Sequence, residues 1–493
     1  MKRISKKIIR GFVLIMIALT IVCICNSCIL NNEWDEYYNN PPDRSNDDLL
    51  TLIGNNENYS TFYNALIENG FEDLLSKNQY FTVFVPTNAA FDGLPAYSRD
   101  EWKKILGFHI IYKNLYSRDF DSLDLMTFIG KYLNMRKTGD NQYRIFESNL
   151  NMANVDEYCR NGVVHEIDRL LIPKPNIYEY IMNLDTSYSI LQDFLNSMDT
   201  RYIDYEKSER IGVNDYGDPI YDTVWRTENY FLDNIAGLNN ETEAYTAFIP
   251  SDKHVRKALD ALSGYFGDIS QMDNKTYKQL LFITFSGSFM NDAYTFNRLP
   301  DTIVSVTGKV LPKSILKAEE ANLEMSNGIV HLLDEMTIPR NFFLVPVVIE
   351  CNEKKNRRVS NTIYPVEELS DSRATNGSYV MYGCQFVGDY LEFTVDMVLK
   401  TTYWITWTGP KQGPSHYQVF VKDEKTGLFV NVGDPVNNWT KPAWKPVVSG
   451  TYTFDSFGTK TIRFVIVNEL PMIGLNSIYV DYIKLTPDEI YVP

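Results

Sequence analysis

The stretch RNGVVHEIDRLLIP at residues 160–173 returns at residues 326–339 as SNGIVHLLDEMTIP. A second pair of stretches, TVFVPTNAAF at 82–91 and TAFIPSDKHV at 246–255, repeats in the same order. Pro86 and Pro250 are 164 residues apart, and Asn161 and Asn327 are 166 apart. Because two separate landmarks are displaced by almost the same number of residues, the sequence predicts a duplicated domain.

Each copy of the longer stretch has the pattern of a turn followed by a strand. The dipeptides Asn161-Gly162 and Asn327-Gly328 tolerate positive φ and therefore favour a tight turn. Residues 163–168 are then expected to alternate between the two faces of a strand. We expect the motif to be mainly structural, with His165 and His331 packed or hydrogen-bonded in the core.

The first 27 residues have the pattern of a targeting segment. Five basic residues, the last of them Arg10, precede an apolar run from Gly11 to Cys25 that is short for a membrane span and typical of a signal peptide. Ser27 precedes Cys28, so we predict Cys28 as the lipidated first residue of the mature chain. The site resembles a bacterial lipobox, and an ordinary secretory signal is the alternative. Residues 28–45 are polar and acidic and predict a tether.

The charge of the mature chain excludes one class of partner. Removing residues 1–27 removes five positive charges and no negative ones, which takes the formal net charge from −16 to −21. Affinity for nucleic acid depends on basic contacts to phosphate, so no nucleic-acid partner is expected. Among the remaining cysteines, Cys351 and Cys384 are candidates for a disulfide in an oxidising compartment, with Cys159 free and buried.

Three separated stretches resemble the fasciclin (FAS1) domain in the order that the family has them. They are ALIENGFEDLLSKNQYFTVFVPTNAAFDGLP at 65–95, ILGFHIIYKNL at 105–115 and NGVVHEIDRLLIP at 161–173. The resemblance covers residues 46–175, and residues 176–342 are similar but diverged. This second copy lacks the histidine at the helix end and carries an extra stretch, rich in Tyr and Asp, near 200–240.

The resemblance implies two α+β fasciclin domains in tandem, each a β-sandwich wedge with helices. It also identifies a set of motif residues for which we expect a mainly structural role. They are Pro86, Thr87, His109, Asn161, Gly162, His165, Asp168, Pro250, Asn327, Gly328, His331 and Asp334. The family's motif segments have been linked to adhesion, so the resemblance implies adhesion as a function.

From about residue 345 the pattern changes to short strands separated by turns that contain glycine, which is typical of a β-sandwich. GDYLEFTV at 388–395, GTYTF at 450–454 and IYVDYIKLTP at 478–487 resemble the galactose-binding-like jelly rolls that include many carbohydrate-binding modules. The resemblance implies that residues 343–493 form an all-β jelly-roll sandwich and that its ligand is a carbohydrate. The predicted fold class is thus multi-domain.

No catalytic constellation is visible in the sequence. The five histidines are scattered without metal-ligand spacing, and no nucleophile elbow, P-loop or Rossmann glycine pattern occurs, so we expect no metal and no cofactor. A pair of carboxylates acting as a glycosidase stays open, although no pair stands out.

Aromatic side chains of the C-terminal region are the better candidates, because sugar rings stack on planar rings. Trp404 and Trp407 are three apart, so on a strand they face opposite ways and one belongs to the core. Trp439 and Trp444 lie in a loop rich in Pro and Asn. The candidate ligand-binding residues are Trp404, Trp407, Tyr417, Trp439 and Trp444.

These observations predict a non-enzymatic, lipid-anchored binding protein, and the combination resembles outer-membrane lipoproteins of Bacteroidetes. The predicted partner is extracellular matrix, another surface protein or a glycan, and the lipid holds the chain to the membrane. Adhesion through the fasciclin domains is the first hypothesis. Glycan capture through the C-terminal sandwich, as an accessory to polysaccharide uptake, is the alternative.

Overall fold

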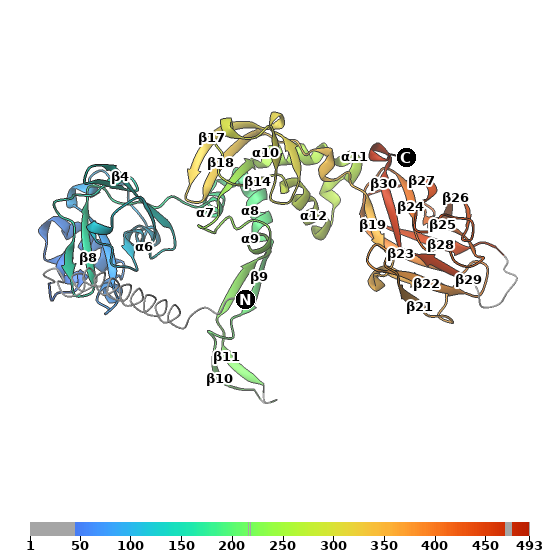
Figure 1. Ribbon diagram of the computed structural model, residues 1–493, viewed down its shortest axis with the longest axis horizontal. Coiled ribbons are helices and arrows are strands. Elements are labelled where there is room, and N and C mark those ends of the chain that lie inside the picture. The colour runs from blue at the N-terminus through green and yellow to red at the C-terminus, as the bar shows by residue number, and fades with distance from the viewer. Residues whose placement is uncertain (1–44, 215, 217, 469–475, 493) are drawn as a thin grey trace, which may run out of the picture. The chain divides into compact units, whose positions relative to one another are not determined.

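The computed structural model describes residues 45–214, 216, 218–468 and 476–492 (Figure 1). The predicted signal segment and Cys28 lie outside the described residues. The chain divides into two compact units, Met1–Lys174 and Pro175–Pro493. Among the described residues, no helix is long and apolar enough to cross a membrane.

The first unit is built on a sheet with the strand order β2-β1-β8-β7 and a second sheet with the order β3-β4-β5-β6. Its strands are β1 (Phe81–Pro86), β2 (Ile110–Ile111), β3 (Leu123–Met126), β4 (Tyr132–Gly139), β5 (Gln142–Ile145), β6 (Ser148–Asn149), β7 (Glu157–Cys159) and β8 (Gly162–Ile167). Its α-helices within the described residues are α3 (Leu49–Gly54), α4 (Ser60–Glu68), α5 (Glu72–Leu75) and α6 (Arg99–Phe108).

The parallel strands β1 and β8 form the centre of this unit, and every residue of both is buried. Val164 packs with the residues of the helices on one side, whereas Ile167 packs with those of β4 and β5 on the other. The predicted alternation of residues 163–168 between the two faces of a strand agrees with this packing, and both faces of β8 are buried. Strands that are buried on both faces usually have continuous apolar sequences. In β8 the buried polar residues His165 and Glu166 interrupt that apolar sequence.

The second unit begins with the same arrangement. Its sheet has the order β14-β13-β18-β17, and β13 pairs in parallel with β18 in the register that β1 and β8 use, Tyr245 opposite Gly328 as Phe81 is opposite Gly162. The strands are β13 (Tyr245–Pro250), β14 (Phe289–Asn291), β15 (Thr302–Val304), β16 (Val310–Pro312), β17 (Lys317–Met325) and β18 (Gly328–Glu335). The helices are α7 (Ile177–Met182), α8 (Ser189–Asn196), α9 (Tyr230–Asn234), α10 (Asp252–Asp260), α11 (Ser263–Phe266) and α12 (Asn274–Phe285).

A long hairpin, here called the arm (residues 199–229), interrupts this second copy between α8 and α9. In the first copy only residues 69–71 separate the corresponding helices α4 and α5. The arm consists of two successive two-stranded ribbons, β9 (Asp199–Ile203) with β12 (Trp225–Asn229), and β10 (Glu209–Val213) with β11 (Pro219–Asp222). Figure 1 shows β10 and β11 at the end of the arm that is far from α8 and α9.

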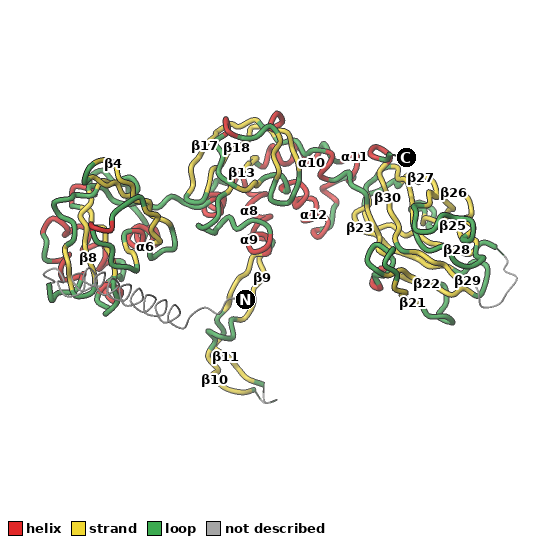
Figure 2. Tube along the Cα trace, in the orientation of Figure 1, coloured by secondary structure: helices red, strands yellow, loops and turns green. Residues whose placement is uncertain are grey.

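Strands dominate the rest of the chain (Figure 2). The sheets have the orders β19-β30-β24-β27, β20-β23-β28-β25-β26 and β21-β22-β29. The strands are β19 (Val347–Glu350), β20 (Arg357–Val359), β21 (Val366–Ser370), β22 (Ser378–Cys384), β23 (Tyr390–Val398), β24 (Thr402–Trp407), β25 (His416–Lys422), β26 (Phe429–Asn437), β27 (Val447–Thr453), β28 (Gly458–Ile466), β29 (Asn476–Val480) and β30 (Tyr482–Pro487). Trp407, Tyr417 and Phe464 pack together in the core, with ring centroids 5.2 to 5.9 Å apart.

The disulfide considered between Cys351 and Cys384 is absent, and both thiols are free and buried. Cys351 follows the edge strand β19 of one sheet, whereas Cys384 ends β22 in another, and each Sγ lies against a backbone carbonyl. Burial raises the pKa of both thiols, which keeps them protonated and unreactive.

Candidate functional site

Asn161 is a buried clamp between distant parts of the first unit. Its Oδ1 accepts a hydrogen bond from the N–H of Leu49 at 2.8 Å, at the start of α3. Its Nδ2 donates to the carbonyl oxygens of Leu75 at 2.6 Å and Lys77 at 2.9 Å. The side chain is completely buried, so all of its hydrogen-bonding capacity is used to hold the fold together.

Asn327 forms the same clamp in the second copy. Its Oδ1 accepts from the N–H of Ile177 at 2.9 Å, at the start of α7, and its Nδ2 donates to the carbonyls of Leu238 at 2.8 Å and Asn240 at 3.1 Å. We call the two arrangements the asparagine clamps. Their equivalence gives the asparagine of the repeated motif a structural role.

In the first copy the glycine of the motif has a different role from the one predicted. Neither Asn161 nor Gly162 has a positive φ, so the turn before β8 does not depend on this dipeptide's tolerance of that conformation. Instead, a Cβ at position 162 would lie 2.3 Å from the carbonyl oxygen of Phe81, and one at Gly328 would lie 2.0 Å from that of Tyr245. Glycine is needed because β8 and β18 approach the neighbouring parallel strand too closely for a side chain.

The motif histidines are satisfied by the backbone in their neutral form. The Nε2 of His165 donates to the carbonyl of Leu115 at 2.7 Å, and its Nδ1 accepts from the N–H of Asp156 at 3.1 Å. The bonds of His331 are equivalent, to the carbonyl of Tyr294 at 3.0 Å and from the N–H of Asn322 at 3.1 Å. Neither ring has a nitrogen left for a metal or for proton transfer.

Residues outside the predicted motif set complete the hydrogen bonding around the two histidines and the buried strands. Asp156 and Asn322, the two donors, both have left-handed φ, of 59° and 65°, which aims each N–H at its imidazole. Thr82 and Thr246, one residue into the buried strands, each bridge two backbone groups through the hydroxyl. The repeated Thr of TVFVP and TAFIP was a visible signal for the threonines, whereas nothing in the sequence marked the left-handed residues.

The other motif residues occupy strand ends. Pro86 and Pro250 are the last residues of β1 and β13, and the N–H of Thr87 donates to the carbonyl of Ile167. Asp168 accepts three hydrogen bonds of 2.8 Å from Ser148 and Asn149, which ties β6 to the end of β8. Asp334, its counterpart, is exposed. The motif is thus complete only in the first copy.

His109 lies at the C-terminal end of α6 and is completely buried. Its Nδ1 donates to the carbonyl of Ile105 at 2.9 Å, and its Nε2 accepts from the N–H of Leu171 at 3.0 Å. Burial lowers the pKa of His109 to about 4, because the charged form would lose its hydration.

We expect the stability of the first unit to fall between pH 6.5 and pH 4. In this range the folded state keeps His109 neutral while the unfolded chain binds a proton, so the free energy of unfolding rises with pH and is lost as pH falls. The slope for this one group is about 1.4 kcal/mol per pH unit at most. Burial lowers the pKa of His165 as well and adds to the effect. Urea denaturation at a series of pH values measures how steeply the free energy of unfolding depends on pH. In the His109→Gln variant this slope should be smaller by about the contribution of one titrating group. An unchanged slope in the variant would contradict the assignment.

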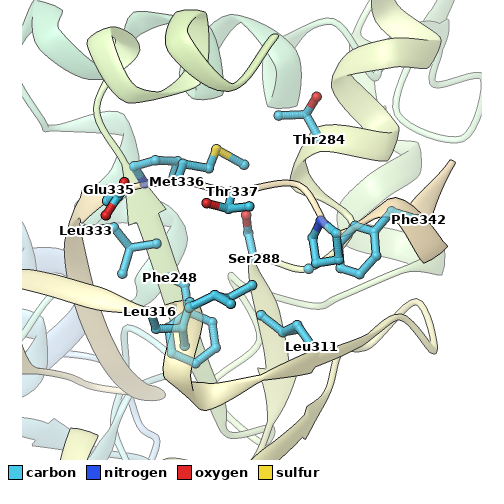
Figure 3. Close-up of a pocket in the computed structure, with 14 residues that line it drawn as sticks. Phe248, Thr284, Ser288, Leu311, Leu316, Leu333, Glu335, Met336, Thr337 and Phe342 are labelled. Atoms are coloured by element: carbon cyan, nitrogen blue, oxygen red, sulfur yellow. The ribbon is translucent and has the colours of Figure 1, made fainter. Parts of the chain in front are cut away.

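A small cavity occupies the corresponding place in the second copy. The carbonyl of Ser288 accepts from the N–H of Phe248, as that of His109 accepts from Phe84, so the shorter serine stands where the imidazole is in the first copy. Figure 3 shows Ser288 and Thr337 beside this space, near Phe248 and Phe342. The cavity measures about 30 Å³, enough for a water molecule and far below the roughly 300 Å³ of a ligand pocket. The cavity is therefore a gap in the packing of the diverged second copy and is too small for a ligand.

The C-terminal tryptophans differ sharply in accessibility. Trp407 and Tyr417 are each 1% exposed, so they cannot contact a ligand and the prediction for these two was wrong. Both point into the core because they sit on the inward face of β24 and β25. Trp404 stacks on Tyr491 at 4.5 Å and donates to Asp488 at 2.6 Å. Trp439 is 58% exposed and is the best placed to receive a ligand.

Trp444 lies half-buried on the loop that carries Trp439. The ring of Tyr379 packs against its ring at 5.4 Å, and the guanidinium of Arg373 lies over it at 5.1 Å. Arg373 is also held by Asp371 through two hydrogen bonds of 2.9 and 2.7 Å, while its side chain remains 64% exposed. We call the loop residues Trp439 and Trp444, together with the Arg373 and Tyr379 side chains that lie against Trp444, the aromatic loop cluster.

Polar contacts fix the backbone of this loop. The Nζ of Lys441 and the N–H of Trp444 both donate to the carbonyl of Gly409, at 2.7 and 3.1 Å. Asn438 is buried and links the core hydroxyl of Tyr417, at 3.0 Å, to the carbonyl of Gln412. The loop therefore presents Trp439 from an anchored base, which lowers the entropy cost of binding. Sequence reasoning found the two tryptophans but missed Arg373 and Tyr379, which are distant in the chain.

The first unit carries an apolar groove of about 320 Å³. Phe71, Leu74, Phe128 and Ile129 contribute its apolar surface, and Lys103 lies at the same groove. Phe128 is 37% exposed. In the part of the chain that the structure describes, no group of three or more His, Cys, Asp or Glu side chains could hold a metal ion.

Residues 57–173 match the family model of the Fasciclin domain. A curated relative, Protein sll1483 of Synechocystis sp. (strain PCC 6803), is 29% identical over 134 residues, which are 25% of this chain and 73% of the relative. The prediction of a fasciclin domain in the first unit is thereby confirmed, and the tandem arrangement stays a prediction.

Solved structures give weaker likenesses. The FAS1 domain pair of the insect cell adhesion molecule Fasciclin I is 17% identical with a TM-score of 0.23, covering 58% of this chain and 98% of that one. A family 35 carbohydrate binding module from Clostridium thermocellum is 18% identical with a TM-score of 0.21, covering 29% and 97%. A Paenibacillus xanthan lyase is 19% identical with a TM-score of 0.25, but the match covers 32% of this chain and only 15% of the lyase. At TM-scores this low, none of the three decides a function.

Proposed function

We propose that this chain is a non-enzymatic binding protein that captures carbohydrate through the aromatic loop cluster. The observation that carries the proposal is Trp439, a large ring that is 58% exposed on an anchored loop. One face of a sugar ring is apolar and stacks on such a ring, while its hydroxyls need hydrogen-bond partners. The exposed guanidinium of Arg373, held near Trp444, supplies donors of that kind.

In this proposal the remainder of the chain holds the binding site at the cell surface. We propose that a lipid on Cys28 anchors the mature chain to a bacterial outer membrane and that the acidic residues after it form the tether. The satisfied bonds of His109, His165 and His331 support a scaffold without catalytic chemistry.

The test is binding of the mature chain, with Cys28→Ser to keep it free of lipid, to an array of bacterial, plant and host glycans. Trp439→Ala should weaken binding about tenfold, because a stacked ring contributes on the order of 1.4 kcal/mol. Trp225→Ala is the matched control, since Trp225 is similarly exposed, at 51%, but lies in the arm. A blank array, or equal losses in the two variants, would overturn the proposal.

Adhesion to a protein surface is the second candidate function. The match of residues 57–173 to the Fasciclin domain supports it, as does the apolar groove, which is large enough for one or two side chains of a partner. If the array is blank while Phe128→Ser abolishes attachment of coated beads to host or bacterial surfaces, adhesion becomes the better account.

A further inference from the structure

The apolar groove of the first unit has a charge opposite to that of the chain as a whole. The charged residues that line it are Lys103 and Lys104, and none of its described lining residues is acidic. The whole chain, in contrast, has 63 acidic residues against 47 basic ones. Neither ion pair described in the first unit involves Lys103. An aromatic ring flanked by carboxylates would therefore match both the apolar surface and the charge of this groove.

Aromatic rings lie in and beside the groove. The rings of Phe71 and Phe128 lie edge to face with centroids 6.0 Å apart, and the ring of Tyr112 lies 5.6 Å from that of Phe128. Phe128 is 37% exposed and Tyr112 is 49% exposed. The groove, of about 320 Å³, has room for one or two side chains. A further ring would extend this aromatic surface, because aromatic side chains favour edge-to-face and offset-stacked contacts.

A segment with the matching chemistry precedes the described residues in the same chain. Residues 33–38 read EWDEYY, so Trp34 has an acidic residue on either side and two tyrosines shortly after it. Residues 28–44 together contain four acidic residues and one basic residue. The tether thus carries a large aromatic ring between carboxylates, which is what the groove selects.

The place where the tether joins the first unit lets it reach the groove. Ser45 donates its N–H to the carbonyl of Tyr158 on β7 at 3.1 Å. Tyr158 lies in one row of the sheet with Ile111 on β2, and the N–H of Phe128 donates to the carbonyl of the residue before Ile111. Three strand spacings separate β7 from β2, about 14 Å, whereas the eleven positions from Trp34 to Ser45 span up to about 36 Å. The tether is therefore long enough to pass around the helices that cover this face.

We propose that the tether binds back to the first unit, with Trp34 in the apolar groove and the acidic residues on either side of it next to Lys103 and Lys104. The segment then covers the apolar surface that the second candidate function uses for a partner. A partner protein can bind there only after it displaces Trp34. The contact depends neither on the lipid nor on the glycan site.

The contact also sets how far the first unit stands from the lipid, a consequence that rests on the proposed anchor at Cys28. Six positions separate Cys28 from Trp34, which is about 20 Å at full extension. The seventeen positions from Cys28 to Ser45 extend to about 56 Å. Binding of the tether thus holds the first unit close to the membrane, and release lets it move outward.

Disulfide trapping in the mature Cys28→Ser chain tests the contact. The native cysteines of the described residues are buried, so the added cysteines are the ones that react. We expect the Asp35→Cys/Lys103→Cys chain to form its intramolecular disulfide at least about tenfold faster than the Asp35→Cys/Lys137→Cys chain, because binding raises the effective concentration at the groove. Lys137 is the matched control, since it is also an exposed lysine of the first unit but lies on β4.

Removal of single rings then identifies the group that holds the tether. Trp34→Ala should lower the rate of the groove pair to that of the control pair, whereas Tyr38→Ala should change it less than about twofold. Equal rates for the two cysteine pairs, a rate that survives Trp34→Ala, or an equal loss with Tyr38→Ala would overturn the proposal. Disulfide-linked dimers would place the segment on a second copy and would overturn it as well. Fast trapping together with a blank glycan array would overturn only the proposed function.

Discussion

Replacing Gly328 with alanine should destabilise the second copy by about 3–5 kcal/mol. The added Cβ would lie 2.0 Å from the carbonyl oxygen of Tyr245 and 2.9 Å from Cδ1 of Ile177. The first neighbour is backbone in the central strand β13, so it cannot turn aside as a side chain would. The φ of 155° adds strain for any residue with a Cβ.

Differential scanning calorimetry of the mature chain measures this loss as a lower transition temperature. Gly264→Ala is the control, because its Cβ meets nothing within 4 Å and the position is in α11, where alanine is preferred. Similar transitions for Gly328→Ala and the wild type would show that β13 and β18 can move apart at little cost.

Asn161→Ala should cost the first unit about 3–5 kcal/mol. The substitution removes three hydrogen bonds and leaves the buried N–H of Leu49 and the carbonyl of Leu75 without their partner. Each unsatisfied buried group costs roughly 1–3 kcal/mol, whereas the alanine gains nothing in return.

Urea denaturation followed by tryptophan fluorescence measures the change. Asn88→Ala is the matched control, because Asn88 also bonds to two backbone groups, of Thr61 and Glu57, but in a solvent-exposed place where water replaces it. Its cost should stay below about 1 kcal/mol. Equal costs for the two asparagines would mean that the buried clamp is not what stabilises the unit.

The sequence was informative where a stretch of residues occurred twice at a constant spacing. The spacing of two repeated stretches indicated the duplication, and the structure shows the same sheet order and the same parallel register in both copies. The reason inferred for the repeated glycine, tolerance of positive φ, fails for Gly162 and applies to Gly328, and the close approach between strands 81 residues apart was missed because it leaves no local pattern. Burial of Trp407 and Tyr417 was missed for the same reason: which face of a strand points inward depends on the sheet that covers it.

The candidate site shows the same limit. A loop rich in Pro and Asn directed attention to Trp439 and Trp444, since such loops are often exposed, and Trp439 is indeed 58% exposed, while ligand binding by either stays a prediction. The side chains that hold Trp444, Arg373 and Tyr379, come from another part of the sandwich and carry no sequence signal. The absence of a histidine in the second copy was visible, yet only the structure shows that its place became a cavity.

The asparagine clamps also determine how each copy would respond to force. A pull applied to the chain before residue 45 would enter the first unit near Leu49, and the chain leaves that unit at Lys174, after β8, which Asn161 precedes. The clamp joins these two places directly, although Leu49 and Asn161 are 112 positions apart in the sequence. Under such a pull the clamp and the hydrogen bonds between β1 and β8 would bear the load together, and the segment between Leu49 and Asn161 would extend only after these contacts break.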